Sequence, residues 1–157
     1  LYKHFSSKED LAAAAMVRLM QRTLALIEQQ AATPGLRAAQ RLAAVVRWAL
    51  TLQLSGDMPS LPSQNSSLRA ELLAHGDYLD LLMRVSEALG GWILQAQADG
   101  HIDPSLPPEV VLYTIYARAC DPVPGFLKAG GQHSDAQIVD WVLGTCMNGL
   151  RGRMAAA

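Results

Sequence analysis

Apolar residues recur at helical spacing along nearly the whole chain, and each such stretch ends at a glycine or a proline. Residues three and four positions apart share one face of a helix, so this spacing predicts amphipathic helices. No stretch shows the strict alternation that is typical of a half-buried strand. The pattern therefore predicts an all-α fold, a bundle of about six helices. The predicted helices cover residues 7–30, 42–55, 68–74, 78–96 and 109–119 and a last segment from 135, with a short continuation at 126–129.

Capping residues refine where these helices begin. Ser7 is a hydroxyl cap followed by acidic residues in the first turn, so the first helix has the clearest start. The pair Gly76-Asp77 is expected to break and cap the chain before the long fourth helix, and Asp135 is expected to cap the last one. Pro122 and Pro124 must end or kink the fifth helix.

Composition limits both the size of the fold and its partners. The chain has 157 residues, and 50% of them are hydrophobic, which is enough for one sizeable core and one main domain. Its 13 Lys and Arg against 14 Asp and Glu give a net charge of -1. A complete nucleic-acid-binding domain usually has a basic excess, so any part of this chain that contacts DNA is expected to be small.

Several classes of function lack the residue patterns that they need. Cys120 and Cys146 are far apart, and neither they nor the four histidines have metal-binding spacing. No nucleophile elbow, phosphate-binding glycine loop or reactive Cys-His spacing occurs. We therefore expect neither an enzyme nor a metal or cofactor. Arginines interrupt the apolar stretches and no secretory leader opens the chain, so a cytoplasmic protein without a membrane span is expected.

The residues at the start of the chain, LYKHFSSKEDL at 1–11, end one pattern and begin another. An aromatic residue and a polar pair precede Phe5, and Ser7-Lys8 then begins a helix whose amide groups and ammonium group can hold a phosphate. This motif resembles the junction between the recognition helix and the connecting helix in the TetR family of transcriptional repressors. By this resemblance the DNA-contacting residues are Tyr2, Lys3, His4 and Lys8.

The same resemblance implies a division of the chain into two parts. Residues 1–6 would be the tail of a helix-turn-helix DNA-binding domain, and residues 7–157 an effector-binding and dimerisation domain. The opening in mid-pattern, without an initiator Met, indicates that most of the DNA-reading headpiece lies upstream. Operator DNA is then expected to be a partner of the full-length protein only, because the side chains that read base edges are outside this sequence.

The effector domain that the resemblance implies needs a pocket with flat or flexible apolar walls and a few polar groups. The candidate ligand-binding residues are Met16, Met20, Trp48, Met58, Trp92, Tyr113, Tyr116 and Phe126. Trp92 and Tyr116 are the strongest candidates, because each amphipathic ring belongs to a central helix and its polar edge needs a partner. The competing interpretation is that these side chains only fill the core, where burial contributes ~25 cal/mol per Å².

The last helix combines small residues with large apolar ones, a mixture that lets another helix approach closely. In the TetR family the last two long helices form a four-helix interface with their symmetry mates, and such a two-fold contact suits a palindromic operator. By this resemblance the expected homodimer interface includes Trp141, Val142, Thr145 and Gly149. Packing of the same helix face within one chain is the alternative.

Together these features predict a ligand-responsive, DNA-binding transcriptional regulator. In that interpretation it is a repressor, and an apolar or aromatic small molecule that prefers the unbound state releases it from its operator. The alternative is a helical carrier or scavenger of small molecules without DNA binding. The two differ in what is encoded upstream of Leu1, because only the regulator needs two further short helices with a basic face.

Overall fold

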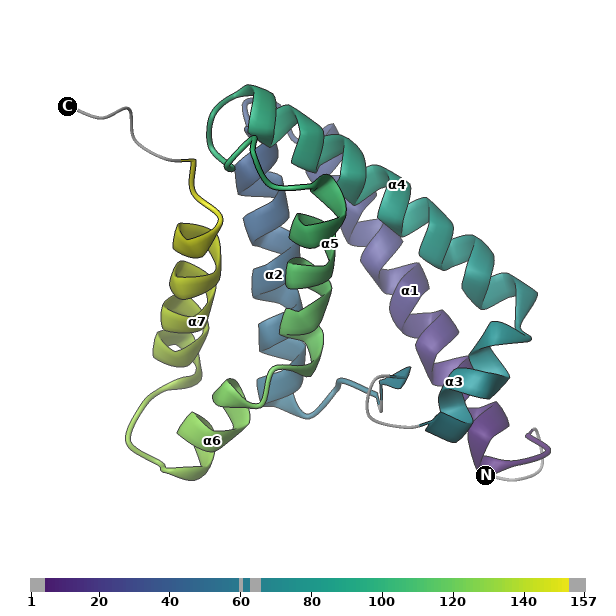
Figure 1. Cartoon of the computed structure of the whole chain (residues 1–157). Coiled ribbons are helices and arrows are strands. Elements are labelled where there is room, and N and C mark those ends of the chain that lie inside the picture. Colours follow the sequence, from purple (N-terminus) through teal and green to yellow (C-terminus); the bar gives the residue numbers. More distant parts are fainter. Residues whose placement is uncertain (1–4, 60, 63–65, 153–157) are drawn as a thin grey trace.

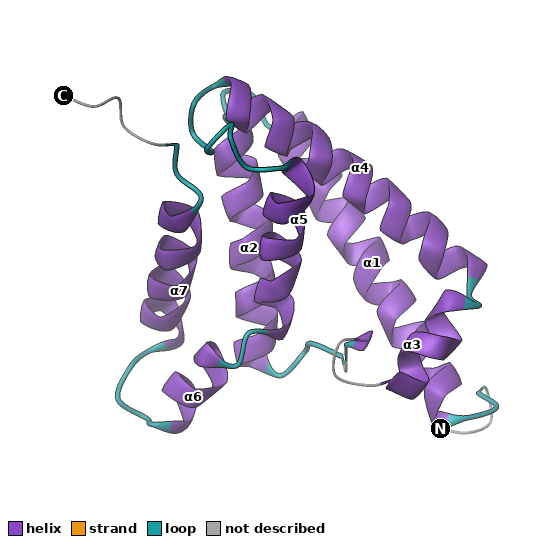
Figure 2. Cartoon of the chain, viewed as in Figure 1, coloured by secondary structure: helices purple, strands orange, loops and turns teal. Residues whose placement is uncertain are grey.

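The computed structural model describes residues 5–59, 61–62 and 66–152, and these form helices and connecting loops without any strand, which confirms the all-α class (Figures 1 and 2). The long predicted helices are confirmed, and the segment after the proline break is helical as well. The elements are α1 (Lys8–Ala32), α2 (Ala38–Ser55), α3 (Ser66–Leu73), α4 (Gly76–Ala98), α5 (Pro108–Ala117), the 3-10 turn η2 (Arg118–Cys120), α6 (Val123–Ala129) and α7 (Asp135–Gly149).

Local signals decide where α1 and α2 begin and end. The Ser7 hydroxyl accepts a hydrogen bond of 3.0 Å from the amide of Asp10, which satisfies one of the free N–H groups at the start of α1. At the C-terminal end of α2, Gly56 has a φ of 79°, a left-handed conformation that glycine adopts without steric cost. Both ends agree with the boundaries that the sequence predicts.

Two predicted caps are wrong. The cap of α4 is His75, whose ring nitrogen Nδ1 accepts from the amide of Tyr78 at 3.3 Å, and Gly76 and Asp77 already belong to the helix. The cap of α7 is Ser134, because its hydroxyl accepts from the amide of Gln137 while the Gln137 side chain accepts from the Ser134 amide. This reciprocal capping box satisfies two amides at once. Asp135 instead pairs with Lys128 at 3.1 Å.

Helix α4 packs against α1, α2 and α5, and in Figure 1 it runs along the right-hand side of the bundle. Helix α7 lies at one side of the molecule, where it packs against α2 and the short α6. Large side chains that are fully buried come from α2, α3, α4 and α7 and from the turn after α4: Leu42, Leu50, Leu68, Leu72, Leu89, Ile93, Ile102 and Ile138. None of the helices in the described ranges has the length and apolar character needed to cross a membrane.

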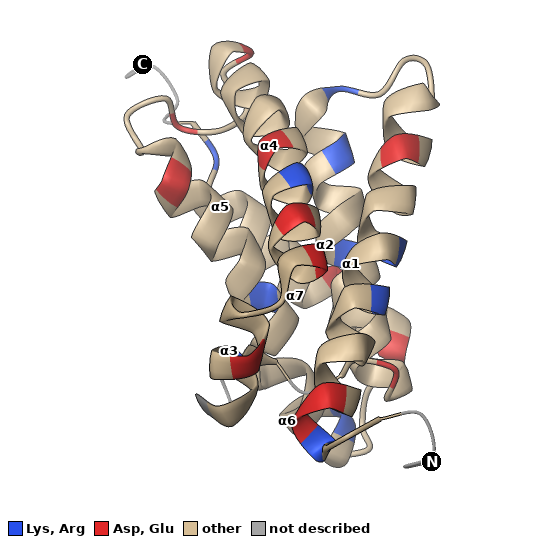
Figure 3. Cartoon of the chain, turned by 90° about the vertical axis from the view of Figure 1, so that its right-hand side faces the viewer, with Lys and Arg blue, Asp and Glu red and all other residues tan. Residues whose placement is uncertain are grey.

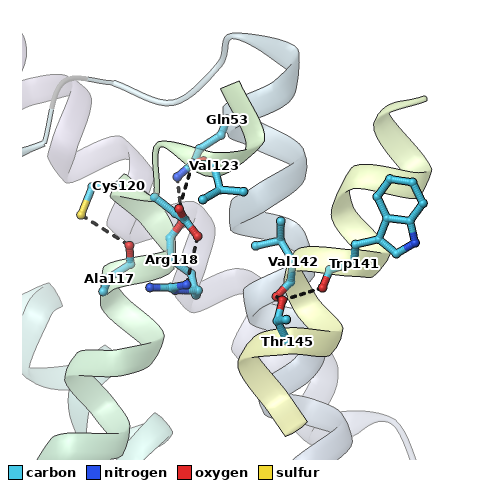
Figure 4. A network of polar contacts seen from close by, with 9 residues as sticks. Gln53, Ala117, Arg118, Cys120, Val123, Trp141, Val142 and Thr145 are labelled. Atoms are coloured by element: carbon cyan, nitrogen blue, oxygen red, sulfur yellow. Dashed lines mark hydrogen bonds and ion pairs between the residues drawn. The ribbon is translucent and has the colours of Figure 1, made fainter. Parts of the chain in front are cut away.

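A polar network holds the break between α5 and α6 (Figure 4). The Arg118 guanidinium pairs with Asp121 at 3.0 Å, and the other oxygen of that carboxylate accepts from the amide of Val123 at 2.9 Å. The Gln53 side chain of α2 donates to the carbonyl oxygen of Arg118 at 2.7 Å. The prolines that follow therefore interrupt the helix at a place where side chains satisfy the freed backbone groups.

Candidate ligand-binding cavity

A cavity of about 680 Å³ lies between α1, α2, α4 and α5, with the segment after α2 forming part of its wall. This volume is typical of a site for a small organic molecule. The helices contribute side chains at helical spacing, so each presents one continuous face to the cavity. These faces include Met16, Leu19, Met20 and Thr23 from α1, Val45, Val46, Trp48 and Ala49 from α2, Tyr78, Leu82, Val85, Ser86 and Leu89 from α4, and Leu112, Tyr113, Ile115 and Tyr116 from α5.

The polar atoms of the lining are few, and all belong to uncharged groups. The hydroxyl of Ser86 on α4 and the phenol of Tyr116 on α5 are 2.6 Å apart, a hydrogen bond in which either oxygen can be the donor. The Thr23 hydroxyl donates to the carbonyl oxygen of Leu19 at 2.8 Å, and the Cys120 thiol donates to that of Ala117 at 3.6 Å (Figure 4). No charged side chain is among the described residues that line the cavity.

Two tyrosines of the cavity, Tyr78 and Tyr116, have raised pKa values. Burial raises the pKa of Tyr116 above its usual value of 10.0, the hydrogen bond from Ser86 lowers it by less, and the nearby phenols of Tyr78 and Tyr113 raise it further. Burial also raises the pKa of Tyr78. At physiological pH the cavity therefore offers neutral hydroxyl groups and no fixed charge.

Six of the eight predicted ligand-binding residues line this one cavity: Met16, Met20, Trp48, Met58, Tyr113 and Tyr116. They come from α1, α2, α5 and the loop after α2, so the fold brings together residues that are far apart in the sequence. Arg22 lies 5.6 Å from the ring centre of Trp48, a cation–π contact made by a residue outside the lining. Tyr113 is 66% exposed, which places it at the mouth of the cavity.

The other two predicted residues do not line the cavity. Helix α4 is longer than the cavity wall, which ends at Leu89, and Trp92 lies one turn beyond, where its ring is 5.8 Å from the Arg41 guanidinium of α2. Phe126 belongs to α6 and is 74% exposed, because this helix lies at the edge of the molecule, beside α7. The prediction of Trp92 and Phe126 as wall residues is therefore corrected.

Sequence reasoning missed the most distinctive feature of the lining, the hydrogen-bonded pair of Ser86 and Tyr116. The signal that could have found Ser86 is its position on α4, four residues after Leu82 and three before Leu89, on a face that is otherwise apolar. A lone hydroxyl on such a face needs a partner, and periodicity alone does not say which helix supplies it. The pair joins residues that are 30 positions apart.

Three of the four predicted DNA-contacting residues, Tyr2, Lys3 and His4, lie outside the described residues. The fourth, Lys8, is exposed in the first turn of α1. The first cavity residue of this helix, Met16, follows eight positions later, about 12 Å along the helix axis. Charged residues of both signs follow one another along α1 and α4 rather than gathering by sign, as the turned view in Figure 3 shows.

The predicted interface residues of α7 divide into two groups. Trp141, Thr145 and Gly149 are exposed, whereas Val142 is 6% exposed and belongs to the core of its own chain. The Thr145 hydroxyl donates to the carbonyl oxygens of Trp141 and Val142, at 2.7 and 3.1 Å (Figure 4). Since its surface is already covered, Val142 is not available for an interface.

No metal site accompanies the cavity: within the described ranges, no three or more His, Cys, Asp or Glu residues are placed to hold an ion. Protein-family models, curated proteins and solved structures were all compared with this chain, and none of them matches it. The features that point to a function are therefore the cavity, the helices around it and the residues at the start of the chain.

Proposed function

We propose that this chain is the effector-binding and dimerisation part of a ligand-responsive, DNA-binding transcriptional regulator of the TetR type. One observation carries the proposal, namely that α1 combines two roles. Its first turn, with the Ser7 cap and the exposed Lys8, belongs to the motif at residues 1–11 that resembles the family's DNA-binding junction. Its next turns, from Met16 to Thr23, line an apolar cavity of ligand size.

In the proposed mechanism α1 links the effector to DNA. The free amides at its start, together with the Lys8 ammonium, hold a DNA phosphate. An effector that binds only one arrangement of α1 changes the distance between the two DNA-reading headpieces of a dimer, away from the ~34–36 Å that successive major grooves require. The effector therefore releases the repressor only if it prefers the arrangement that does not fit DNA.

The proposed homodimer uses the outer face of α7. This face contains the exposed residues Trp141, Thr145 and Gly149. Its small residues allow the same helix of a second copy to approach. A two-fold contact of this kind matches the symmetry of a palindromic operator.

The test uses the complete gene product, in which the proposal requires DNA-reading helices before residue 1. Binding to duplex DNA is measured by fluorescence anisotropy at several salt concentrations. Replacing Lys8 with Ala should reduce the slope of log K against log salt by about one, because one phosphate contact is lost. Arg18→Ala, an exposed residue of the same helix, is the control and should leave the slope unchanged. A complete product that does not bind duplex DNA would refute the proposal.

The apolar cavity also favours a second candidate, a carrier or scavenger of small molecules that has no role at DNA. The two functions share the ligand site and differ in its coupling to DNA. For the regulator, ligand and DNA must change each other's affinity by the same factor. A ligand that fills the cavity of the complete product without changing its affinity for DNA favours the carrier.

A further inference from the structure

We infer that the cavity selects a neutral, largely apolar ligand with one hydroxyl or carbonyl oxygen, and that the hydroxyl pair of Ser86 and Tyr116 binds this oxygen. The inference rests on the proposed function in one respect, that this cavity is the effector site. It goes further in assigning the chemical class of the ligand and its polar anchor.

The pair has hydrogen-bonding capacity left for a ligand. Two hydroxyl groups 2.6 Å apart carry two protons, and only one of them forms the hydrogen bond between Ser86 and Tyr116. The second proton can be donated to a ligand oxygen, and the oxygen lone pairs can accept a proton from a ligand hydroxyl. Burial raises the pKa of Tyr116, so the phenol keeps its proton at physiological pH.

Three other polar groups of the lining, on Thr23, Cys120 and Tyr113, do not replace this anchor. The Thr23 hydroxyl and the Cys120 thiol each donate to a carbonyl oxygen of their own segment, so their protons are already used. Tyr113 is mostly exposed and lies at the mouth. The Tyr78 hydroxyl and the Trp48 indole N–H also belong to the lining, but only Ser86 and Tyr116 bring two hydroxyl groups together, so we expect the ligand oxygen at this pair.

A charged ligand has no partner in this cavity. A buried carboxylate needs several donors or a cation, and the described lining contains no Lys, Arg or His. Neither Arg118, which pairs with Asp121, nor Arg22, which lies against the Trp48 ring, is among the described residues of the lining. A ligand ammonium finds no carboxylate in the lining either. Carboxylic acids and amines are therefore excluded as their ions.

The apolar part of the lining suits a flat ring system. Met16, Met20 and Met58 supply flexible thioether side chains that adapt to the edges of a ring, and Trp48 supplies a flat aromatic wall. Naphthalene derivatives provide a matched series, because the ring is constant and only the polar group changes.

The test measures the affinity of the full chain for 2-naphthol, naphthalene and 2-naphthoate by isothermal titration calorimetry at pH 7.5. We expect 2-naphthol to bind most tightly and 2-naphthoate at least 50-fold more weakly. Tyr116→Phe should lower the affinity for 2-naphthol about 3- to 10-fold, which is the effect of one neutral hydrogen bond. The affinity of this variant for naphthalene should stay within twofold of the original value. Thr114→Ala removes a hydroxyl of the same helix that lies outside the lining, and it should leave all three affinities within twofold.

The folding of each variant is checked by its thermal unfolding midpoint. A double variant with Ser86→Ala and Tyr116→Phe removes both partners of the hydrogen bond, so that no buried hydroxyl is left unpaired. It should bind 2-naphthol and naphthalene equally well. If 2-naphthoate binds as tightly as 2-naphthol, or if Tyr116→Phe weakens naphthalene as much as 2-naphthol, the inference is wrong and the proposed function stands. If none of the three binds, the cavity is not the effector site and the inference is also wrong. The Lys8→Ala measurement then decides separately whether the protein acts on DNA.

Discussion

The buried phenols are the side chains whose chemistry depends most on their surroundings. Tyr78 and Tyr116 face the same cavity from α4 and α5, and burial disfavours the charged phenolate of each. An interior that holds its tyrosines neutral is also one that rejects charged ligands, so the same low polarity determines the protonation of the wall and the class of ligand proposed for it.

The raised pKa values of the buried tyrosines predict a loss of stability in alkali. In the unfolded chain a tyrosine titrates near its usual pKa of 10.0, whereas burial raises the pKa of Tyr116 in the folded chain. The free energy of unfolding is therefore independent of this group below pH 10 and falls as the pH rises through the higher folded pKa. Urea unfolding at several pH values should show this fall, and Tyr116→Phe should make it less steep.

Burial also raises the pKa of the Cys146 thiol from its usual 9.0. This thiol therefore adds a further fall in the free energy of unfolding, which begins near pH 9. A profile that is the same in the Tyr116→Phe variant as in the unchanged chain would contradict the assignment.

The fluorescence of the three tryptophans should respond unequally to a bound ligand, since only Trp48 lines the cavity. We expect Trp48→Phe to remove most of the change in tryptophan emission on titration with cyclohexanol, a neutral ligand that does not absorb with indole. Trp92→Phe and Trp141→Phe should keep the change, because Trp92 lies beyond the cavity wall and Trp141 on the outer face of α7. The result that would overturn this is a signal that is lost in the Trp92→Phe variant.

At the scale of helices and turns, the ends of elements depend on single hydrogen bonds. Ser7 caps α1 and Ser134 caps α7 through their side chains, while the left-handed Gly56 ends α2. These contacts join residues three or four positions apart, so they form as soon as the local chain folds. Helix α1 is the important case, since its first turn belongs to the proposed DNA contact and its later turns line the cavity.

Removing the cap of α1 should destabilise the chain. In the Ser7→Ala variant the amide of Asp10 loses its acceptor, which should lower the free energy of unfolding by about 1 kcal/mol. The adjacent Ser6→Ala is a matched control, because the Ser6 hydroxyl makes no hydrogen bond with the described residues. Urea denaturation measures both variants, and equal losses of stability would rule out a capping role for Ser7.

At the scale of the whole molecule, the bundle has one face of α7 that its own helices leave uncovered. This face contains Trp141 and Gly149, and His133 packs edge-on against the Trp141 ring at 4.9 Å. The proposed homodimer covers it, so its test is a measurement of association rather than of folding.

Gly149→Arg should abolish the homodimer at micromolar concentration and leave the fold intact. A Cβ atom added at Gly149 meets nothing within 4 Å in the chain itself, and the position is exposed, so we expect a monomer to tolerate the larger residue. In an interface the buried guanidinium would clash and lose its hydration. Sedimentation velocity gives the mass, and Gly91→Arg on α4, which is equally open, is the control that should stay dimeric. A dimer that survives Gly149→Arg would place the interface elsewhere.

The sequence by itself was sufficient for the all-α class and for most helix boundaries, because caps, left-handed glycines, prolines and helical periodicity act over a few neighbouring residues. It also identified six wall residues, since large flexible or aromatic side chains on apolar faces are the usual material of a cavity. The errors at His75 and Ser134 are local too: in each place the true cap lies next to the predicted one.

What only the tertiary structure decided is where each helix face lies along its neighbours. Trp92 and Leu89 share a face of α4, yet the cavity ends between them, because α2 meets α4 at Trp92. Val142 and Trp141 are adjacent in sequence, yet packing within the chain buries only Val142. The pairing of Ser86 with Tyr116 likewise depends on how far α5 slides along α4. Helical periodicity specifies a face around an axis and carries no information about position along that axis, so these contacts follow from packing alone.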